Sequence, residues 1–120
     1  MNSKTVDFVR ALVEKFSILI PVFKEHIEDQ NGEVLPHVFL ADITRLIINR
    51  IQKFGLEDKI TRKIIDELET AYMEGNNQII ELISASFLEN LPMTGESGAE
   101  IRLIVGPHMQ EHLRRTGNIW

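Results

Sequence analysis

Apolar and polar residues along the chain follow the period of an α-helix. Between short breaks rich in proline and glycine, apolar residues recur at steps of three and four, which is the spacing of one helix face, whereas a strand would alternate. The first stretch carries such a stripe at Val6, Val9, Val13, Phe16 and Ile20. The breaks fall at Pro21, Asn31, Gly32, Pro36, Gly55, Gly75, Pro92, Gly95, Gly98, Gly106, Pro107 and Gly117. The pattern predicts an all-α protein.

These breaks divide the chain into six to seven short helices. The expected helices cover the stretch up to about residue 20, residues 36–54, 57–74 and 76–91, a short helix that starts at about 97–100, and a last helix from Pro107 to Gly117. Residues 21–29 are expected to form either a second helix or a kinked continuation of the first. Residues 76–91 are apolar nearly all round, so we expect this helix to be central and the most deeply buried. Ser97 and Glu100 have the spacing of a capping box, which would start the short helix. Short helices with short connections predict a compact orthogonal bundle with a single core, so residues 1–120 are expected to form one domain.

Composition narrows the functional classes. The 120 residues include 13 Lys and Arg against 18 Asp and Glu, a formal net charge of −5, whereas a dedicated nucleic-acid binder carries a basic surface. We therefore expect no nucleic-acid partner. Cysteine is absent, which removes disulfides, thiolate zinc sites and cysteine nucleophiles and fits a reducing compartment. No stretch approaches 18 consecutive apolar residues and the first residues lack the pattern of a secretion signal, so we expect a cytoplasmic protein without a membrane partner.

One short motif has the residue types of a metal enzyme. His108-Met109-Gln110-Glu111-His112 matches the pattern His-x-x-Glu-His, in which two imidazoles one turn apart bind zinc beside a carboxylate. A catalytic zinc needs a third protein ligand, and no acidic residue or histidine follows His112. We therefore expect no metal and no cofactor. P-loop, dinucleotide and nucleophile-elbow patterns are also missing from the sequence, so an enzyme that uses His108, Glu111 and His112 is the lesser alternative to a non-enzymatic protein.

The acidic charge lies in one part of the chain. Residues 55–100 contain three basic and ten acidic side chains, a net charge of −7, whereas residues 1–54 are neutral and residues 101–120 carry +2. Helix starts, a capping box, a loop and basic neighbours one turn away account for six of the ten acids. The remaining four are Glu69, Glu74, Glu81 and Glu89. They are our candidate partner-binding residues; the alternative is a solvated acidic face.

Basic residues suggest two further features. Arg62 and Lys63 each precede an acid, Asp66 and Glu67, by one helical turn, so we expect two ion pairs on the helix surface. Six basic residues of adjacent helices form a cluster that keeps DNA binding open as an alternative. They are Arg45, Arg50, Lys53, Lys59, Arg62 and Lys63.

Three stretches carry a family resemblance. They read Leu-Pro-His-Val-Phe-Leu-Ala-Asp-Ile at 35–43, Ile-Ser-Ala-Ser-Phe-Leu-Glu-Asn-Leu at 83–91 and Ile-Val-Gly-Pro-His-Met at 104–109. Together they resemble an uncharacterised family of small all-helical bacterial proteins, over about residues 35–115. Members of this family look like immunity proteins of polymorphic toxin systems, so the resemblance implies a protein partner rather than a reaction. It supplies no catalytic residues, and His37, Asp42 and Glu89 stay open to a structural or a functional role.

Two functional hypotheses follow. The first is a non-enzymatic bacterial immunity-type protein that binds and neutralises a cognate, basic toxin domain, partly through the acidic surface. The second is a self-associating helical regulatory or scaffolding module, for which a homodimer is the expected form. It rests on Val38, Leu40 and Ile48, which fall off the main apolar stripe of their helix and would extend an apolar patch to the surface.

Overall fold

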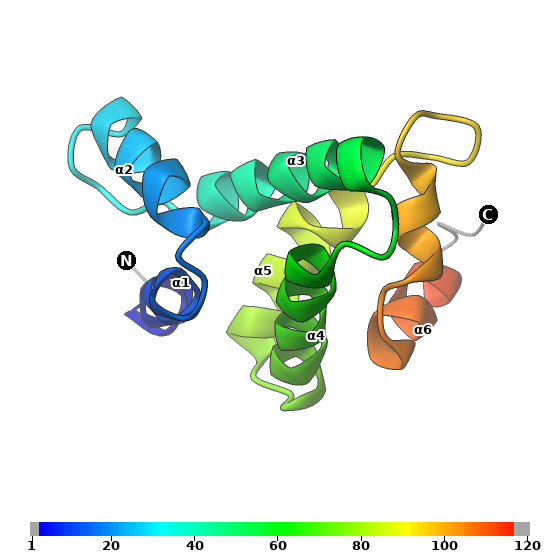
Figure 1. Ribbon diagram of the computed structural model, residues 1–120. Coiled ribbons are helices and arrows are strands. Elements are labelled where there is room, and N and C mark those ends of the chain that lie inside the picture. Colours follow the sequence, from blue (N-terminus) through cyan, green and yellow to red (C-terminus); the bar gives the residue numbers. More distant parts are fainter. Residues whose placement is uncertain (1–2, 117–120) are drawn as a thin grey trace.

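Residues 3–116, the part of the chain that the computed structural model describes, contain eight helical segments. They are α1 (Ser3–Lys15), α2 (Leu19–Asp29), α3 (Pro36–Phe54), α4 (Lys59–Met73), α5 (Asn77–Ser86), the 3-10 helices η1 (Leu88–Asn90) and η2 (Ala99–Leu103), and α6 (Pro107–Arg115). Strands are absent from these residues, so the predicted all-α class is confirmed. In Figure 1, α3 crosses above α4 and α5, with α1 and α2 on one side and η2 and α6 on the other. The steep crossings and a radius of gyration of 13.7 Å confirm a compact orthogonal bundle.

α5 lies at the centre of the bundle, as its apolar sequence predicts. It contacts α1, α3 and α4, and Leu82 and Ile83 are fully buried. The side chain of Asn76 accepts hydrogen bonds from two N–H groups of the first turn, which is the usual role of an N-cap asparagine. The helix ends at Ser86 rather than near residue 91, because the chain tightens into the 3-10 turn of η1.

Proline and glycine mark helix ends as the sequence predicts. Pro36 and Pro107 occupy the first positions of α3 and α6, where a missing N–H costs nothing. Gly55 ends α3 with a φ of +86°, a conformation that favours glycine. The first helix is shorter than predicted. α1 ends at Lys15, a turn follows, and Pro21 lies in the first turn of α2. The expected end of α6 at residue 117 lies outside the described residues.

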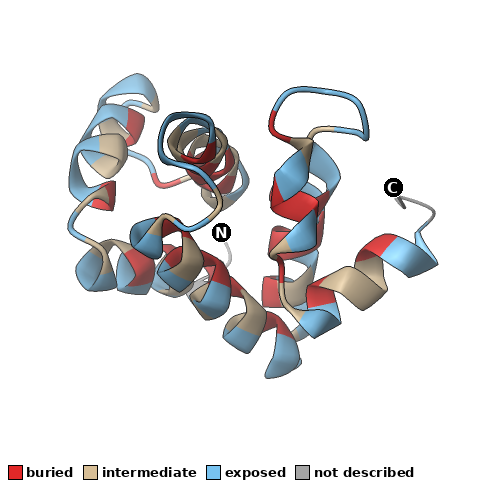
Figure 2. Cartoon of the chain, turned by 45° about the vertical axis from the view of Figure 1, so that its right-hand side comes forward, coloured by how far each residue is buried: buried red, intermediate tan, exposed pale blue. Residues whose placement is uncertain are grey.

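Apolar side chains from several helices form the core. The largest fully buried side chains are Phe39, Phe87, Leu12, Leu19, Leu40, Ile43, Ile47, Ile64, Ile65, Leu68, Leu82 and Ile83. Burial of each stabilises the fold by roughly 1.5–3 kcal/mol relative to exposure. Figure 2 shows the buried positions on the faces that the helices turn toward one another. Within residues 3–116, every helix is too short or too polar to cross a membrane.

The predicted capping box before η2 does not form. η2 follows Gly98, and within the described residues its first N–H groups receive no side-chain cap. The hydroxyl of Ser97 instead accepts a hydrogen bond from Nε2 of Gln52 on α3. Gly98 has a φ of +89°, and a Cβ at this position would lie 2.9 Å from Cγ2 of Ile48. Backbone conformation and close approach to α3 therefore fix the start of η2.

Candidate functional site

Glu69 joins α4 to the start of α6. Its Oε2 accepts hydrogen bonds from the backbone N–H of His108 at 2.9 Å and from Nδ1 of the same residue at 2.6 Å, and its Oε1 accepts one from the N–H of Met109 at 3.1 Å. N–H groups in the first turn of a helix have no partner within that helix. A carboxylate from another helix thus acts as the N-cap of α6. Only 14% of the Glu69 side chain is exposed, so this candidate binding residue lies mostly inside the fold.

Gly106 makes room for Glu69. An ideal Cβ at residue 106 would lie 2.4 Å from both Cγ and Cδ of Glu69, which is far shorter than a van der Waals contact between carbon atoms. The φ of Gly106 is −70°, so the backbone conformation itself does not require glycine. The Gly-Pro pair of the resemblance therefore has a packing explanation, in which Gly106 admits the carboxylate and Pro107 starts the helix.

The residues of the zinc-like motif have separate partners. His108 contacts the α4 carboxylate, whereas Nδ1 of His112 lies 3.0 Å from the hydroxyl of Tyr72. Burial lowers the pKa of His112, and the charge of Arg115 lowers it further. Glu111 pairs with the arginines of the following turn. Across residues 3–116, no three His, Asp or Glu side chains lie close enough together to hold a metal ion.

The other three candidate glutamates are exposed. Glu74 is the C-cap residue of α4, Glu81 lies on α5 and Glu89 lies in η1. None of the three forms a hydrogen bond or an ion pair with another described residue. Glu74 also borders a hollow of about 330 Å³, whose lining includes the apolar side chains of Phe8 and Ile79. These three carboxylates are therefore available to a partner.

Asp58, by contrast, is fully engaged within the fold. It is the N-cap of α4 and accepts hydrogen bonds from the N–H and the hydroxyl of Thr61. The guanidinium of Arg50 donates to both of its oxygens, at 2.8 and 3.0 Å. These bonds, with that of Arg50 the strongest, hold the pKa of the Asp58 carboxyl far below its usual range, and they outweigh the opposing effect of burial.

The two ion pairs predicted within α4 do not form in the described structure. Arg62 instead donates to the carbonyl of Leu56 and to the carboxylate of Glu57, both before the start of the helix. Glu67 pairs with Lys15 of α1, with Nζ and Oε2 2.6 Å apart. The charged side chains of α4 thus bind the neighbouring segments in preference to each other.

Two stretches of the resemblance meet at the end of α5. Nδ1 of His37 lies 2.6 Å from Oγ of Ser86. The carbonyl of Ser86 accepts hydrogen bonds from the hydroxyl of Thr44 at 3.2 Å and from the side-chain amide of Asn90 at 3.0 Å. A carbonyl at the end of a helix has no partner within the helix, so these bonds close α5. Ser86 is only 4% exposed, which favours a structural role for this serine and histidine pair.

The polar residues of the resemblance do not converge on one site. His37 faces Ser86, whereas the carboxylate of Asp42 pairs with Arg45 on its own helix and has Oδ2 3.8 Å from Nδ1 of His26. Glu89 is exposed on another element. The three residues therefore lie in three separate places, and only His37 and Asp42 have polar partners among the described residues.

Comparison with known proteins gives a family. Residues 9–120 match a domain of unknown function, DUF7674. The chain belongs to the DUF7674 family. The match spans nearly the whole chain, so the resemblance to an uncharacterised family is confirmed, while the likeness to immunity proteins stays a prediction. No curated protein and no solved structure matches the chain.

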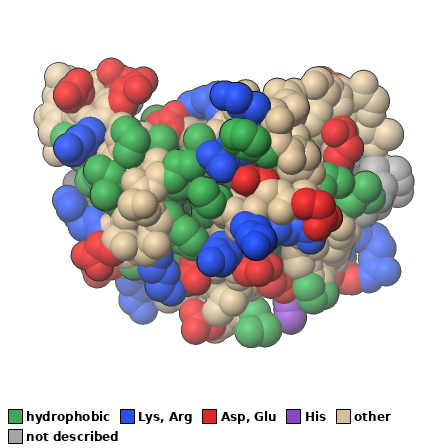
Figure 3. Space-filling model, in the orientation of Figure 1, with side chains coloured by type: hydrophobic (Ala, Val, Ile, Leu, Met, Phe, Trp, Pro, Cys, Tyr) green, Lys and Arg blue, Asp and Glu red, His purple; other side chains and the backbone are tan. Residues whose placement is uncertain are grey.

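The basic cluster of this DUF7674 chain is partly neutralised. Basic side chains gather over α3 and α4 on the face shown in Figure 3, with acidic side chains between them. All three arginines of the predicted cluster pair with a carboxylate. The lysines of the cluster, Lys53, Lys59 and Lys63, form no ion pair with other described residues. Half of the predicted cluster is thus already paired, which weakens the DNA-binding alternative.

The apolar patch predicted for self-association does not form as expected. Leu40 is fully buried in the core, so its expected place on the surface is wrong. Ile48 is half-buried and packs beside Gly98. Val38 remains, with 39% of its surface exposed. A single half-exposed valine is no patch.

A second acidic feature was missed by the sequence analysis. A hollow of about 320 Å³ between α2 and α3 is lined by Glu25, Asp29 and Asp42 among others. Residues 1–54 carry no net charge, so the charge of this segment does not reveal the acids that line the hollow. The spacing of Glu25 and Asp29, one helical turn apart, was the available signal.

Proposed function

We propose that this chain is a non-enzymatic bacterial protein of the immunity type, which acts in the cytoplasm by binding and neutralising a cognate toxin domain. Glu74, Glu81 and Glu89 would contact a basic surface of the toxin. Glu69 is left out of this surface, because its carboxylate caps α6. The proposal is carried by one observation: these three carboxylates are exposed and without a partner among residues 3–116, in a region that uses Asp58, Glu67 and Glu69 within the fold.

The position of Glu74 supports a role outside folding. The C-terminal end of a helix carries a partial negative charge, so an exposed carboxylate there is unfavourable by about 0.3–1 kcal/mol. Glu74 caps this end of α4, and the last turn contains no basic residue to offset it. The adjoining hollow is lined by the apolar Phe8 and Ile79 and by Lys4 and Asp7 besides Glu74. Its two carboxylates outnumber its one ammonium group, so Phe8 and Ile79 would contact the aliphatic stem of a partner's lysine or arginine and Glu74 would bind the charged head.

The polar pairs of the chain support the non-enzymatic half of the proposal. His37 with Ser86 and His108 with Glu69 have the residue types of catalytic pairs. The first closes the end of α5, and the second caps α6. Each pair therefore has a sufficient explanation in the stability of the fold.

The direct test uses the product of the reading frame next to the gene for this chain. We expect that product to arrest bacterial growth when expressed alone, and co-expression of this chain to restore growth. The two purified proteins should also form a complex by calorimetry. A neighbouring product that is harmless, or that does not bind, would remove the immunity function.

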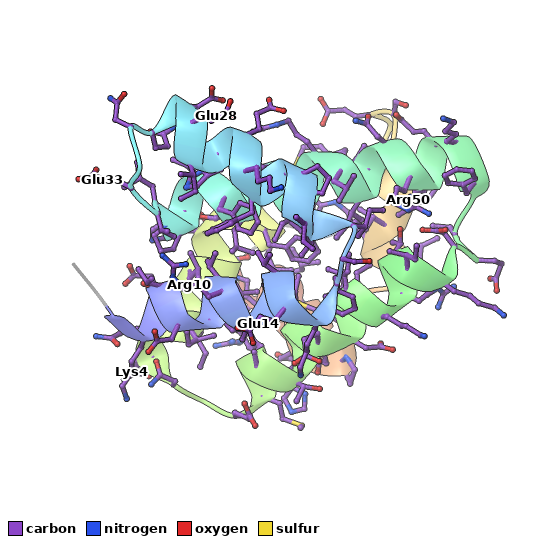
Figure 4. All side chains as sticks on the ribbon, turned by 60° about the vertical axis from the view of Figure 1, so that its left-hand side comes forward. Lys4, Arg10, Glu14, Glu28, Glu33 and Arg50 are labelled. Carbon is purple, nitrogen blue, oxygen red and sulfur yellow. The ribbon has the colours of Figure 1, made fainter. Side chains whose placement is uncertain are left out.

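A charge-reversal experiment tests the surface separately. Replacing the three glutamates together by lysine should weaken the complex by about tenfold or more and flatten its salt dependence, since complementary charges set association rates. The midpoint of thermal unfolding should not fall, because the three side chains are exposed and a lysine at the C-terminal end of α4 is favourable to the helix. A matched control reverses three exposed acids elsewhere, which Figure 4 places on α1, on α2 and in the loop after α2: Glu14, Glu28 and Glu33. Equal losses in both triple variants would assign the effect to net charge and overturn this surface.

A further inference from the structure

The hollow between α2 and α3 has an apolar part and a charged rim. α2 and α3 are packed neighbours (Figure 4). Each contributes a half-buried apolar residue to the lining, Val22 from α2 and Leu46 from α3. The carboxylates of Glu25, Asp29 and Asp42 come from both helices. The volume of about 320 Å³ is at the lower end of the range for small-ligand sites.

The charges around this hollow are unbalanced. Its lining holds three carboxylates and one guanidinium, that of Arg45. Arg45 pairs with Asp42, whereas Glu25 and Asp29 are exposed and have no ion pair with any other described residue. The hollow therefore has two uncompensated negative charges, which favour a cationic ligand.

A buried histidine near Asp42 adds an independent feature. The side chain of His26 is completely buried, and its Nε2 accepts a hydrogen bond from the N–H of Leu35 at 3.0 Å. In the neutral ring the proton therefore lies on Nδ1. This N–H has no hydrogen-bond partner and faces Oδ2 of Asp42 at 3.8 Å, beyond hydrogen-bond distance. A buried donor without a hydrogen bond thus lies close to a carboxylate of the hollow.

His26 and Arg45 hold Asp42 between them. Arg45 is largely exposed, with 66% of its side chain accessible, so it can swing into solvent at little cost. Asp42 would then shift toward His26, so that one of its oxygens accepts a hydrogen bond from Nδ1–H. Its other oxygen would bind a ligand in place of Arg45. The buried imidazole orients the carboxylate, in the way that outer hydrogen bonds orient binding groups.

The carboxylates of the hollow come from two helices, Glu25 and Asp29 from α2 and Asp42 from α3. A cation that spreads its charge over several donors can contact carboxylates from both helices at once. Guanidinium is such a cation, and it binds carboxylates through paired hydrogen bonds. We propose that the hollow between α2 and α3 binds a guanidinium group on an aliphatic chain, with the head between Glu25, Asp29 and Asp42 and the stem on Val22 and Leu46.

The test is a titration of the isotopically labelled full chain with butylguanidinium, followed by amide NMR shifts. We expect a saturable shift confined to α2 and α3, and a response to butylammonium at least about tenfold weaker, because a point charge cannot make the same paired bonds. Shifts spread over all acidic surfaces, no saturable shift, or equal binding of butylammonium would each overturn the proposal. Since this probe needs no protein partner, its outcome is independent of the proposed toxin binding.

Variants locate the site. Glu25→Gln with Asp29→Asn should weaken butylguanidinium binding by about tenfold, whereas the matched pair Glu14→Gln with Glu28→Gln, exposed carboxylates outside the hollow, should leave it unchanged. His26→Phe removes the donor to Asp42 and should also weaken binding, provided that its circular dichroism and unfolding curve match those of the parent chain. If both carboxylate pairs weaken binding equally, the site is wrong.

The source of the guanidinium is decided by two probes of the same chemistry. A capped Gly-Arg-Gly peptide that binds at least as tightly as butylguanidinium identifies the arginine side chain of a protein as the ligand. Tighter binding of free butylguanidinium identifies a small molecule, since flanking backbone would then hinder access to the hollow. Either result supports the guanidinium site, and the absence of binding by both overturns it.

Discussion

Gly106 lies against the carboxylate of Glu69, so close that a Cβ on residue 106 would sit 2.4 Å from Cδ of that side chain. Glu69 is held there by the N–H groups of His108 and Met109. The cap by Glu69 therefore depends on the lack of a side chain at Gly106. It joins α4 to α6, and the C-terminal helix depends on it.

Gly106→Ala should lower the free energy of unfolding by about 1–3 kcal/mol, because the added methyl group forces the glutamate or the backbone to move. Loss of the cap would add to this cost. Urea unfolding followed by circular dichroism measures the change. The backbone at this position accepts alanine, with a φ of −70°, so conformational strain cannot account for the loss.

The Glu69→Ala background provides the control for this prediction. Without the carboxylate, the methyl group at residue 106 meets no atom of that side chain, so Gly106→Ala should then cost less than about 0.5 kcal/mol. A double-mutant cycle gives the coupling energy directly. Costs that simply add would contradict the link between the two residues.

The lowered pKa of Asp58 predicts that the chain loses stability in acid. The Arg50 hydrogen bonds lower the pKa of Asp58 in the folded chain, whereas the unfolded carboxyl has a pKa of about 3.9. The stability that it contributes is therefore present above about pH 4 and is lost as the pH falls below that value. Asp58→Asn should remove part of this acid dependence and destabilise the chain at pH 7. Asp66→Asn removes one exposed carboxylate from the same helix and is the control for the loss of a single negative charge; an equal effect of the two variants would contradict the role of the Arg50 hydrogen bonds.

Helix positions could be predicted from the sequence because proline, glycine and apolar spacing act locally. Pro36, Gly55 and Pro107 mark helix ends in the structure as the pattern predicts. The capping box at Ser97 fails for a nonlocal reason, since its hydroxyl bonds to Gln52 on α3. Local spacing identifies a possible cap, but a partner far along the chain decides whether the cap forms.

The role of Glu69 could not be predicted for the same reason. As a residue of an isolated helix, it looks like a free surface carboxylate, because its partners are backbone groups 39 and 40 positions later. Glu74, Glu81 and Glu89 follow the sequence-based expectation of exposure, because they face solvent from their own elements. Sequence reasoning thus separates acidic from neutral segments, whereas the tertiary contacts decide which acids stay available.

The end of α5 allows a test of the structural explanation for the family-like stretches. Thr44→Val keeps the side-chain volume but removes the hydroxyl that donates to the carbonyls of Leu40 and Ser86. We predict a loss of about 1 kcal/mol in unfolding free energy. Adding Asn90→Ala removes the second donor to the Ser86 carbonyl, and the combined loss should exceed the sum of the two single losses, because a partly buried carbonyl is then left unsatisfied. Strict additivity in urea unfolding would contradict this role.

The lowered pKa of His112 predicts a second pH dependence of the unfolding free energy, at higher pH than that of Asp58. Burial, together with the positive charge of Arg115, lowers its pKa in the folded chain, and the smaller effect of the Glu89 charge opposes this. The unfolded imidazole has a pKa of about 6.5, so between the two values the unfolded chain binds more protons than the folded one. The resulting stability is present above about pH 6.5 and is lost as the pH falls below it.

Two measurements check this prediction. The contact with the Tyr72 hydroxyl holds the ring of His112 in its buried position, so NMR titration should show an inflection of the His112 signals below pH 6.5. His112→Gln should make the free energy of unfolding less dependent on pH between pH 7 and pH 5. An inflection at or above 6.5 would contradict the prediction, because a ring that protonates as readily in the folded chain as in the unfolded one gives no such dependence.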